Sequence, residues 1–202
     1  MGKHKIVHYL NQFFGQIGGE EKANIPPEVK EGPVGPGNAF NNALGDEAEI
    51  VKSIICGDSY FNEHKDEVQK EVKETLQAIK PDLLIAGPAF NAGRYGMACG
   101  GVAEVAHELD IPVVSGIYPE NPGYDMYKQY AYFVETSDSA AGMRNALPDM
   151  VELIKNYFEK DGDLGLPEEE GYMPRGIRKN LFVKKQGSKR AVEMLVAKLK
   201  GE

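Results

Sequence analysis

Short apolar runs alternate along the chain with longer segments in which apolar residues recur every three or four positions. A loop rich in Gly, Pro or Asn follows most of these runs. This alternation is typical of βα units, in which helices connect the strands of a parallel sheet. Five runs are predicted to be strands, and they cover residues 5–10, 48–56, 82–86, 111–117 and 132–135.

Helical spacing accounts for much of the chain between these strands. The clearest segment is 62–80, in which apolar residues share one face until Pro81 ends the pattern. Further helices are predicted over residues 94–109 and 147–159, with a shorter one over 33–42. The pattern therefore predicts an α/β fold of three layers, built on a mainly parallel five-stranded sheet of the Rossmann or flavodoxin type.

The chain is predicted to divide into an α/β domain over residues 1–160 and a C-terminal part over 161–202. Residues 161–174 are polar and rich in Gly, Pro and Glu, as in a linker. A basic helical extension follows, with a helix over 188–200 whose apolar residues share one face. That face requires a cover, which either the body or another polypeptide would supply.

Composition and charge narrow the class of protein. With 202 residues, 42% of them hydrophobic, and 2 Cys, the chain is neither collagen-like, disordered nor a disulfide scaffold. Two cysteines and the lack of a long apolar run predict a cytoplasmic protein that does not bind membranes.

The net charge of −8 divides unevenly along the chain. Residues 175–202 hold nine Lys or Arg and two Glu, a balance of +7, which leaves −15 for residues 1–174. Because an acidic body is repelled by phosphate backbones, we expect no nucleic-acid partner. The basic end is either a solvated segment or a segment that docks on an acidic surface.

Ligands of open parallel sheets bind beyond the carboxyl ends of the strands, so the loops there hold the candidate site residues. The strongest candidates follow the third strand, where Gly93 would let a ligand approach the backbone and Arg94 would bind a carboxylate or phosphate together with Asn91. The alternative is that Asn91 caps the helix and Arg94 pairs with a surface Glu.

The other strand-end loops supply further candidates for substrate binding: Asn11, Asp58, Ser59 and Glu120. Asp58 and Ser59 also suit helix caps. Cys56 is a candidate reactive thiol, although a low thiol pKa requires a positive environment that the sequence does not reveal. No His or Cys spacing indicates a metal site, and no glycine motif indicates a nucleotide.

Six segments of the chain closely resemble the component B selenoprotein of the glycine, sarcosine and betaine reductases. They are residues 8–21 (HYLNQFFGQIGGEE), 31–37 (EGPVGPG), 56–61 (CGDSYF), 86–96 (AGPAFNAGRYG), 139–144 (SAAGMR) and 176–180 (GIRKN). The resemblance extends over essentially the whole chain, and these motifs are long and unusual.

The resemblance implies an anaerobic reductase of small amino acids. In that family a pyruvoyl group on a companion subunit holds the substrate amine, and a selenocysteine of component B attacks the α-carbon. The carboxymethyl group passes to selenoprotein A, acetyl phosphate and ammonia follow, and thioredoxin supplies electrons. Glycine is the first expectation for the substrate, with sarcosine and betaine as alternatives. An alternative from a different functional class is that the chain is a non-catalytic α/β binding or assembly module.

The resemblance also implies that family members are roughly twice as long and carry their selenocysteine in the other half. The chain is therefore expected to correspond to the N-terminal half, inactive alone, with no cofactor of its own and no catalytic residue that can be assigned. It would form part of the substrate pocket and dock the companion pyruvoyl subunit within an oligomer.

Overall fold

A six-stranded sheet forms the centre of the computed structural model, which describes residues 2–177 and 185–201. The strands lie in the order β2-β3-β1-β4-β5-β6, and all neighbours are parallel except β2 and β3. Their bounds are β1 (His4–Asn11), β2 (Glu28–Glu31), β3 (Ala48–Cys56), β4 (Leu83–Phe90), β5 (Val113–Ile117) and β6 (Tyr132–Glu135). The predicted α/β class and mainly parallel sheet are confirmed.

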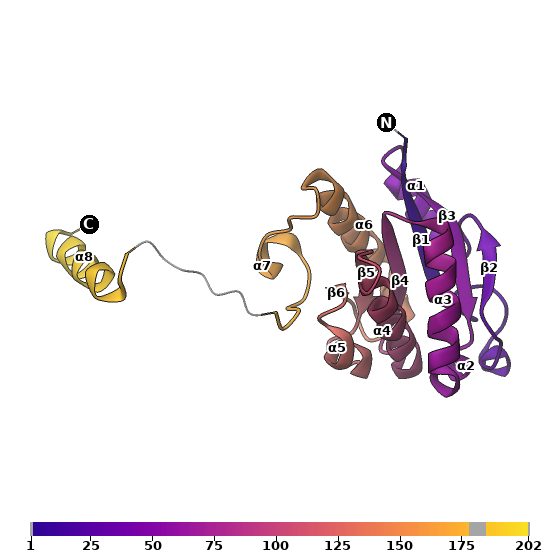
Figure 1. Cartoon of the computed structure of the whole chain (residues 1–202). Helices are drawn as coiled ribbons and strands as arrows, with labels where there is room; N and C mark the ends of the chain where they lie inside the picture. The colour runs from indigo at the N-terminus through magenta and orange to yellow at the C-terminus, as the bar shows by residue number, and fades with distance from the viewer. Residues whose placement is uncertain (1, 178–184, 202) are drawn as a thin grey trace.

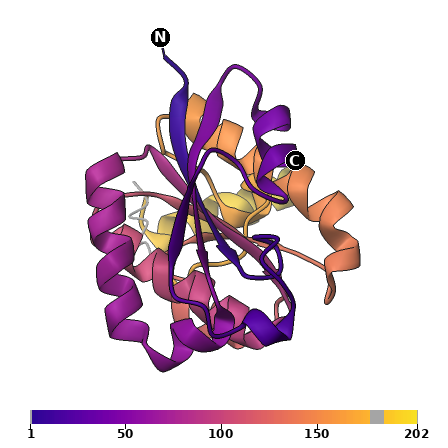
Figure 2. The same cartoon turned by 90° about the vertical axis from the view of Figure 1, so that its right-hand side faces the viewer.

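Helices cover both faces of this sheet (Figure 1, Figure 2). On one face, α3 and α4 pack with residues such as Val72 and Val102 against Tyr9 and Leu84. On the other face, α1 and α6 pack against strand residues such as Ile6 and Ile85. The helices are α1 (Gly37–Leu44), α2 (Asp58–Glu63), α3 (Lys65–Ile79), α4 (Gly93–His107), α5 (Pro122–Tyr127), α6 (Met143–Glu159), α7 (Pro167–Glu170) and α8 (Gly187–Lys200).

The prediction of five strands is wrong, because β2 adds a sixth, antiparallel strand at the edge next to β3. β2 has the sequence EVKE, and its Val29, opposite Ile54, is itself 45% exposed. A short polar edge strand buries too little to leave a hydrophobic pattern in the sequence.

The helix predicted over 62–80 is divided in the structure, because the backbone leaves the helical conformation at His64 between α2 and α3.

The segment predicted to be a linker packs against β6. Leu164 is buried, and the backbone N–H of Met173 donates to the carbonyl oxygen of Phe133 at 2.7 Å. The Arg175 guanidinium lies 4.3 Å from the ring centre of Tyr132. Residues 161–177 therefore cover the outer edge of the sheet, while the division into domains at residue 160 stays a prediction.

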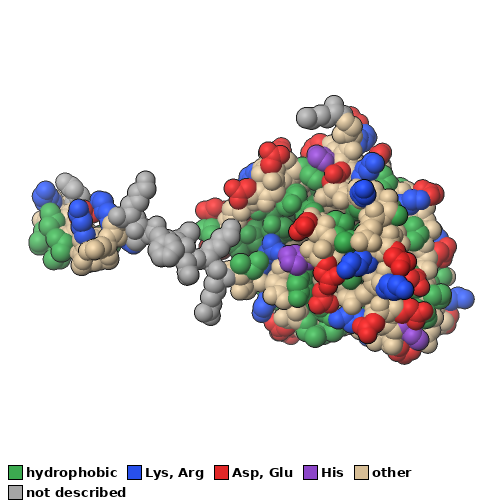
Figure 3. Space-filling view, in the orientation of Figure 1, with side chains coloured by type: hydrophobic (Ala, Val, Ile, Leu, Met, Phe, Trp, Pro, Cys, Tyr) green, Lys and Arg blue, Asp and Glu red, His purple; other side chains and the backbone are tan. Residues whose placement is uncertain are grey.

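The helix predicted near the C-terminus is present as α8, and none of its residues is buried. Five large apolar side chains are exposed on it, among them Leu195 at 59% and Leu199 at 79% (Figure 3). Residues 178–184, which belong to the basic part of the chain, lie outside the described residues. Within the described ranges, no helix has both the length and the apolar character needed to cross a bilayer.

The small residues of α4 allow a close approach to α5. A Cβ added at Gly100 would lie 2.2 Å from Cδ2 and 2.7 Å from Cβ of Tyr127. A Cβ at Gly93, in the first turn of the same helix, would meet Pro122 Cγ at an ordinary 3.7 Å.

We expect Gly100→Ala to destabilise the fold by about 1–3 kcal/mol, because the added methyl overpacks this helix contact by more than alanine's helix preference recovers. Gly93→Ala is the matched control and should change stability by at most about 0.5 kcal/mol. Urea unfolding measures both variants. Equal effects of the two substitutions would show that α4 and α5 are not packed this closely.

Candidate functional site

A cleft of about 290 Å³ lies at the carboxyl ends of β1, β3 and β4, where the sequence placed the site. The ends of these strands, the loops that follow them and the loop after β6 supply its lining residues. Its lining residues are Asn11, Gln12, Phe13, Phe14, Gly19, Glu20, Asp58, Ala89, Phe90, Ala92, Asp138 and Ala140.

Asp58 is the most buried charged residue of this cleft, with 7% of its surface exposed. It follows the last residue of β3 after a single glycine and is the first residue of α2. It does not cap that helix, because Gly57 occupies the N-cap position and no side chain bonds there. The interpretation of Asp58 and Ser59 as helix caps is therefore wrong.

Hydrogen bonds from the end of β1 hold Asp58 in place. The Asn11 amide Nδ2 donates to Asp58 Oδ2 at 3.1 Å, and the Asp58 backbone N–H donates to Gln12 Oε1 at 3.1 Å. The Phe14 N–H in turn donates to Asn11 Oδ1 at 2.9 Å, which orients the amide. Among the described residues, the other carboxyl oxygen of Asp58, Oδ1, has no hydrogen-bond partner.

Burial raises the pKa of Asp58 from 3.8 to about 6. The Asn11 hydrogen bond and the charge of Arg94 oppose this rise, and the charge of Glu20 adds to it. The Asp58 carboxyl therefore gains or loses its proton at slightly acidic pH. At such pH values, small changes in its surroundings alter its protonation.

Aromatic rings form the apolar part of the cleft. Phe14 stands between two other rings, with its centre 6.2 Å from that of Phe90 and 5.8 Å from that of Tyr95. Phe90 is 3% exposed, whereas Phe13 beside it in the lining is 60% exposed. The lining of the cleft thus combines a buried carboxyl with aromatic rings.

Arg94 is already paired. Its guanidinium forms an ion pair with Glu20 and donates to Ser59 Oγ at 2.8 Å. Its side chain is 50% exposed, and it lies at the rim rather than in the lining of the cleft. The alternative in which Arg94 pairs with a surface Glu therefore describes its contacts better than a free anion clamp.

The remaining candidates are dispersed around the rim. Asn91 is exposed and does not cap α4, because Ala92 is the N-cap; its backbone N–H donates to the Asp138 carbonyl at 3.2 Å. Gly93 begins α4, and Glu120 is exposed and outside the lining. Of the predicted site residues, only Asn11 and Asp58 line the cleft. The sequence analysis did not single out four further lining residues: Gln12, Phe14, Phe90 and Asp138.

The candidate thiol Cys56 is the last residue of β3 and is fully buried. Burial raises its pKa to about 12, and the nearby charge of Asp58 adds to this rise. The thiol is thus protonated at neutral pH, which does not suit a nucleophile. No group of three or more His, Cys, Asp or Glu in the described part of the chain is arranged to hold a metal ion.

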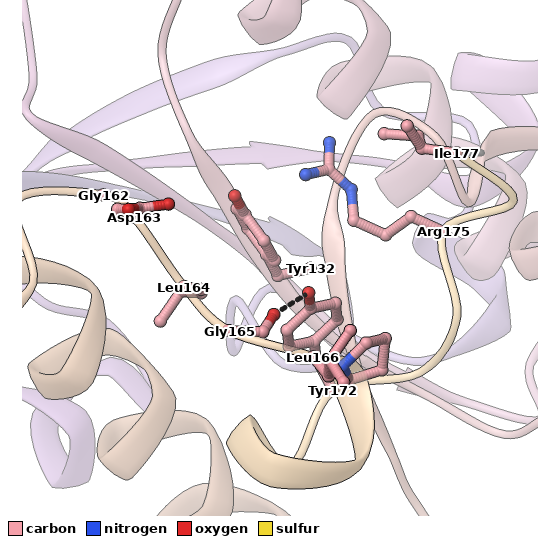
Figure 4. A pocket seen from close by; sticks show the side chains of 10 residues that line it. Tyr132, Gly162, Asp163, Leu164, Gly165, Leu166, Tyr172, Arg175 and Ile177 are labelled. Atoms are coloured by element: carbon pink, nitrogen blue, oxygen red, sulfur yellow. Dashed lines mark hydrogen bonds between the residues drawn. The ribbon is translucent and has the colours of Figure 1, made fainter. Parts of the chain in front are cut away.

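A second cavity of about 330 Å³ lies beside the first residue of β6 (Figure 4). Tyr132 and Tyr172 meet there edge to face, and the Tyr172 hydroxyl donates to the Gly165 carbonyl at 2.8 Å. Arg175 stacks on Tyr132 and donates from Nη2 to the Gln129 carbonyl at 2.6 Å. These contacts fasten residues 161–177 to β6, so this cavity is secondary to the cleft as a candidate site.

We expect Asp58→Asn to stabilise the fold increasingly as the pH rises from 4 to 7.5. The folded chain binds the Asp58 proton more tightly than the unfolded chain, so wild type loses stability across the interval from 3.8 to about 6. The amide of the variant cannot ionise, so the variant avoids this loss of folding free energy, which amounts to up to about 3 kcal/mol. Urea unfolding at several pH values measures the difference, and a pH-independent difference would contradict the raised pKa.

Comparison with known proteins identifies relatives along the whole chain. Residues 3–202 match the family model described as glycine/sarcosine/betaine reductase selenoprotein B. The glycine reductase complex component B subunit gamma of Carboxydothermus hydrogenoformans is 58% identical over 100% of this chain and 46% of its own length. The sarcosine reductase complex component B subunit beta of Peptoclostridium acidaminophilum is 54% identical, again over 100% and 46%.

A more distant relative is the betaine reductase complex component B subunit beta of Peptoclostridium acidaminophilum, 40% identical over 98% of this chain and 46% of its own length. This chain thus spans just under half the length of these relatives. A solved structure, a mutant of the esterase AlinE4, aligns with a TM-score of 0.35 and 18% identity over 100% of this chain and 95% of its own. The chain belongs to the glycine/sarcosine/betaine reductase selenoprotein B family.

Proposed function

We propose that this chain forms one wall of the substrate site in component B of an amino-acid reductase, and that the cleft binds a small amino acid. The observation that carries this proposal is the buried Asp58 carboxyl in the lining of the cleft, with one oxygen held by Asn11 and the other buried without a partner among the described residues. A polar group buried without a partner in a cleft is typical of a site that a ligand completes.

The strand order supports a site in this position. Without the antiparallel β2, the parallel strands lie in the order β3-β1-β4-β5-β6, which is the 2-1-3-4-5 order of flavodoxin-like folds. In such folds the ligand binds outside the carboxyl ends of the strands at which the strand order reverses. We propose that the body is a flavodoxin-like domain and that α8 belongs to a basic extension that docks another polypeptide.

We propose that the reacting groups come from outside these residues. By the family resemblance, a pyruvoyl group on a companion subunit supplies an electrophilic carbonyl, and a selenocysteine supplies a strong nucleophile. The thiols of this chain are buried and protonated, so its own residues bind and orient the substrate. Selenoprotein A and thioredoxin would act as further partners in the cytoplasm.

Glycine is the substrate that we propose first. The relatives named glycine and sarcosine reductase are 58% and 54% identical to this chain, whereas the betaine reductase relative is 40% identical.

In the complete component B, we expect Asn11→Ala to lower kcat/KM for glycine at least tenfold. The substitution removes the hydrogen bond that holds Asp58, so that the carboxyl is misplaced and its pKa rises further. Lys73→Ala is the control, because Lys73 pairs with Glu108 on the outer surface. Acetyl phosphate formation measures both variants. Unchanged activity of the Asn11 variant would favour a non-catalytic binding or assembly module.

A further inference from the structure

Helix α8 presents an apolar face to solvent. Val192, Leu195 and Leu199 recur on it at helical spacing, and each of these side chains is exposed. An isolated helix of 14 residues is only marginally stable in water, and helices in proteins gain most of their stability by packing such a face against a neighbour. The face of α8 therefore requires a partner.

The cavity of about 330 Å³ beside β6 has a matching apolar surface. Its lining includes the side chains of Tyr132, Leu164, Leu166, Tyr172 and Ile177. Leu166 and Ile177 are large apolar residues that are nevertheless 58% and 56% exposed. Figure 3 shows hydrophobic side chains at the surface of the body on the side where its C-terminal segment leaves. We call this surface the β6 groove. An exposed apolar surface with a polar rim is typical of a site that contacts another protein.

Carboxylates surround the β6 groove. Asp163 lines the groove, and the other acidic residues line a neighbouring cavity of about 380 Å³ on α7, β6 and α6. Among the described residues, six of these carboxylates have no ion-pair partner: Glu135, Asp149, Glu152, Asp163, Glu168 and Glu169. Arg175 also lines the groove, but its guanidinium stacks on Tyr132. The rim of the groove is therefore acidic and attracts a basic partner.

The charges of α8 have the opposite sign. Its acidic residue Glu193 pairs with Lys185 at 2.9 Å. Four basic residues of α8 have no ion-pair partner among the described residues: Lys189, Arg190, Lys198 and Lys200. The helix and the β6 groove are thus complementary both in charge and in their apolar surfaces, which favours their association with each other over other pairings.

The position of α8 selects a second copy of the chain as the partner. Figure 1 shows α8 standing apart from the body, and none of its residues is buried. The helix and the β6 groove of one chain therefore leave each other uncovered, whereas two copies can each place α8 in the groove of the other. Such an exchange is self-complementary, so it closes a symmetric dimer that covers both surfaces.

We propose that two copies of this chain form a dimer in which each copy lays the apolar face of its α8 into the β6 groove of the other. Leu195 and Leu199 then pack against Leu166 and Ile177, and the basic residues of α8 lie along the carboxylates at the rim. This inference rests on the proposed role of α8 in docking another polypeptide, and it identifies that polypeptide as a second copy. It does not involve the cleft at the carboxyl ends of β1, β3 and β4.

Sedimentation equilibrium of the full chain at several concentrations tests the proposal, and we expect a monomer–dimer equilibrium. Leu195→Asp on the helix and Leu166→Asp in the groove should each raise the Kd of the dimer at least tenfold, because each places a carboxylate in an apolar contact. Met126→Asp is the matched control and should change the Kd at most about threefold. Met126 is 60% exposed on α5 and does not line the groove.

An equimolar mixture of the two variants tests the exchange itself. The Leu195→Asp chain keeps an intact groove, and the Leu166→Asp chain keeps an intact α8. The mixture should therefore form dimers through one intact contact, at a concentration where each variant alone is monomeric. A variant that does not fold cannot restore the dimer, so recovery in the mixture also shows that both variants are folded. Circular dichroism of each variant checks its fold independently.

Three results would overturn the proposal: a wild-type chain that stays monomeric, a dimer that only Leu195→Asp weakens, or no recovery in a mixture of two folded variants. The first would mean that α8 is covered within its own chain or by another protein, and the second that α8 pairs with α8. These measurements are independent of reductase activity. If the dimer forms as expected but activity does not depend on Asn11, the exchange stands and the proposed role of the cleft fails; the reverse pair of results has the opposite meaning.

Discussion

The hydrogen bond between Asn11 and Asp58 joins the ends of two neighbouring parallel strands, and the candidate site is arranged around it. Asn11 stands opposite Cys56 in the pairing of β1 with β3, so both strands end at the same level of the sheet. The residues that follow β1 and β3 in the chain therefore lie next to each other. Asp58 is brought under the loop of β1, and its carboxyl is buried with one oxygen bound to Asn11 and the other without a partner among the described residues.

This part of the site follows from the sequence. Asn11 ends one strongly apolar run, and Asp58 follows another after a single glycine. Parallel strands bring such positions to the same edge of the sheet. The β-branched and aliphatic runs also predicted the parallel strands, because buried strands must be apolar on both faces. The sequence therefore predicted those features of the strands and of the site that depend on local patterns.

The rest of the site depends on the path of the loops, which local patterns do not determine. The loop after β1 lies so close to residues 35–37 that a Cβ at Gly35 would stand 2.0 Å from the Phe14 carbonyl oxygen. This contact helps to fix where Phe14 points. Arg94 meets Glu20 across 74 residues of sequence. The structure therefore favours the alternative in which Arg94 forms an ion pair over its role as an anion clamp.

The account depends on Asp58 being a buried carboxyl with one oxygen that lacks a hydrogen-bond partner among the described residues. The most direct test is the pKa of Asp58 in the folded chain, measured from the pH dependence of its side-chain carboxyl carbon by NMR. The account predicts a value near 6, set by burial. A value of 4 or below would contradict it, because such a carboxyl would be either solvated or fully bonded within the protein.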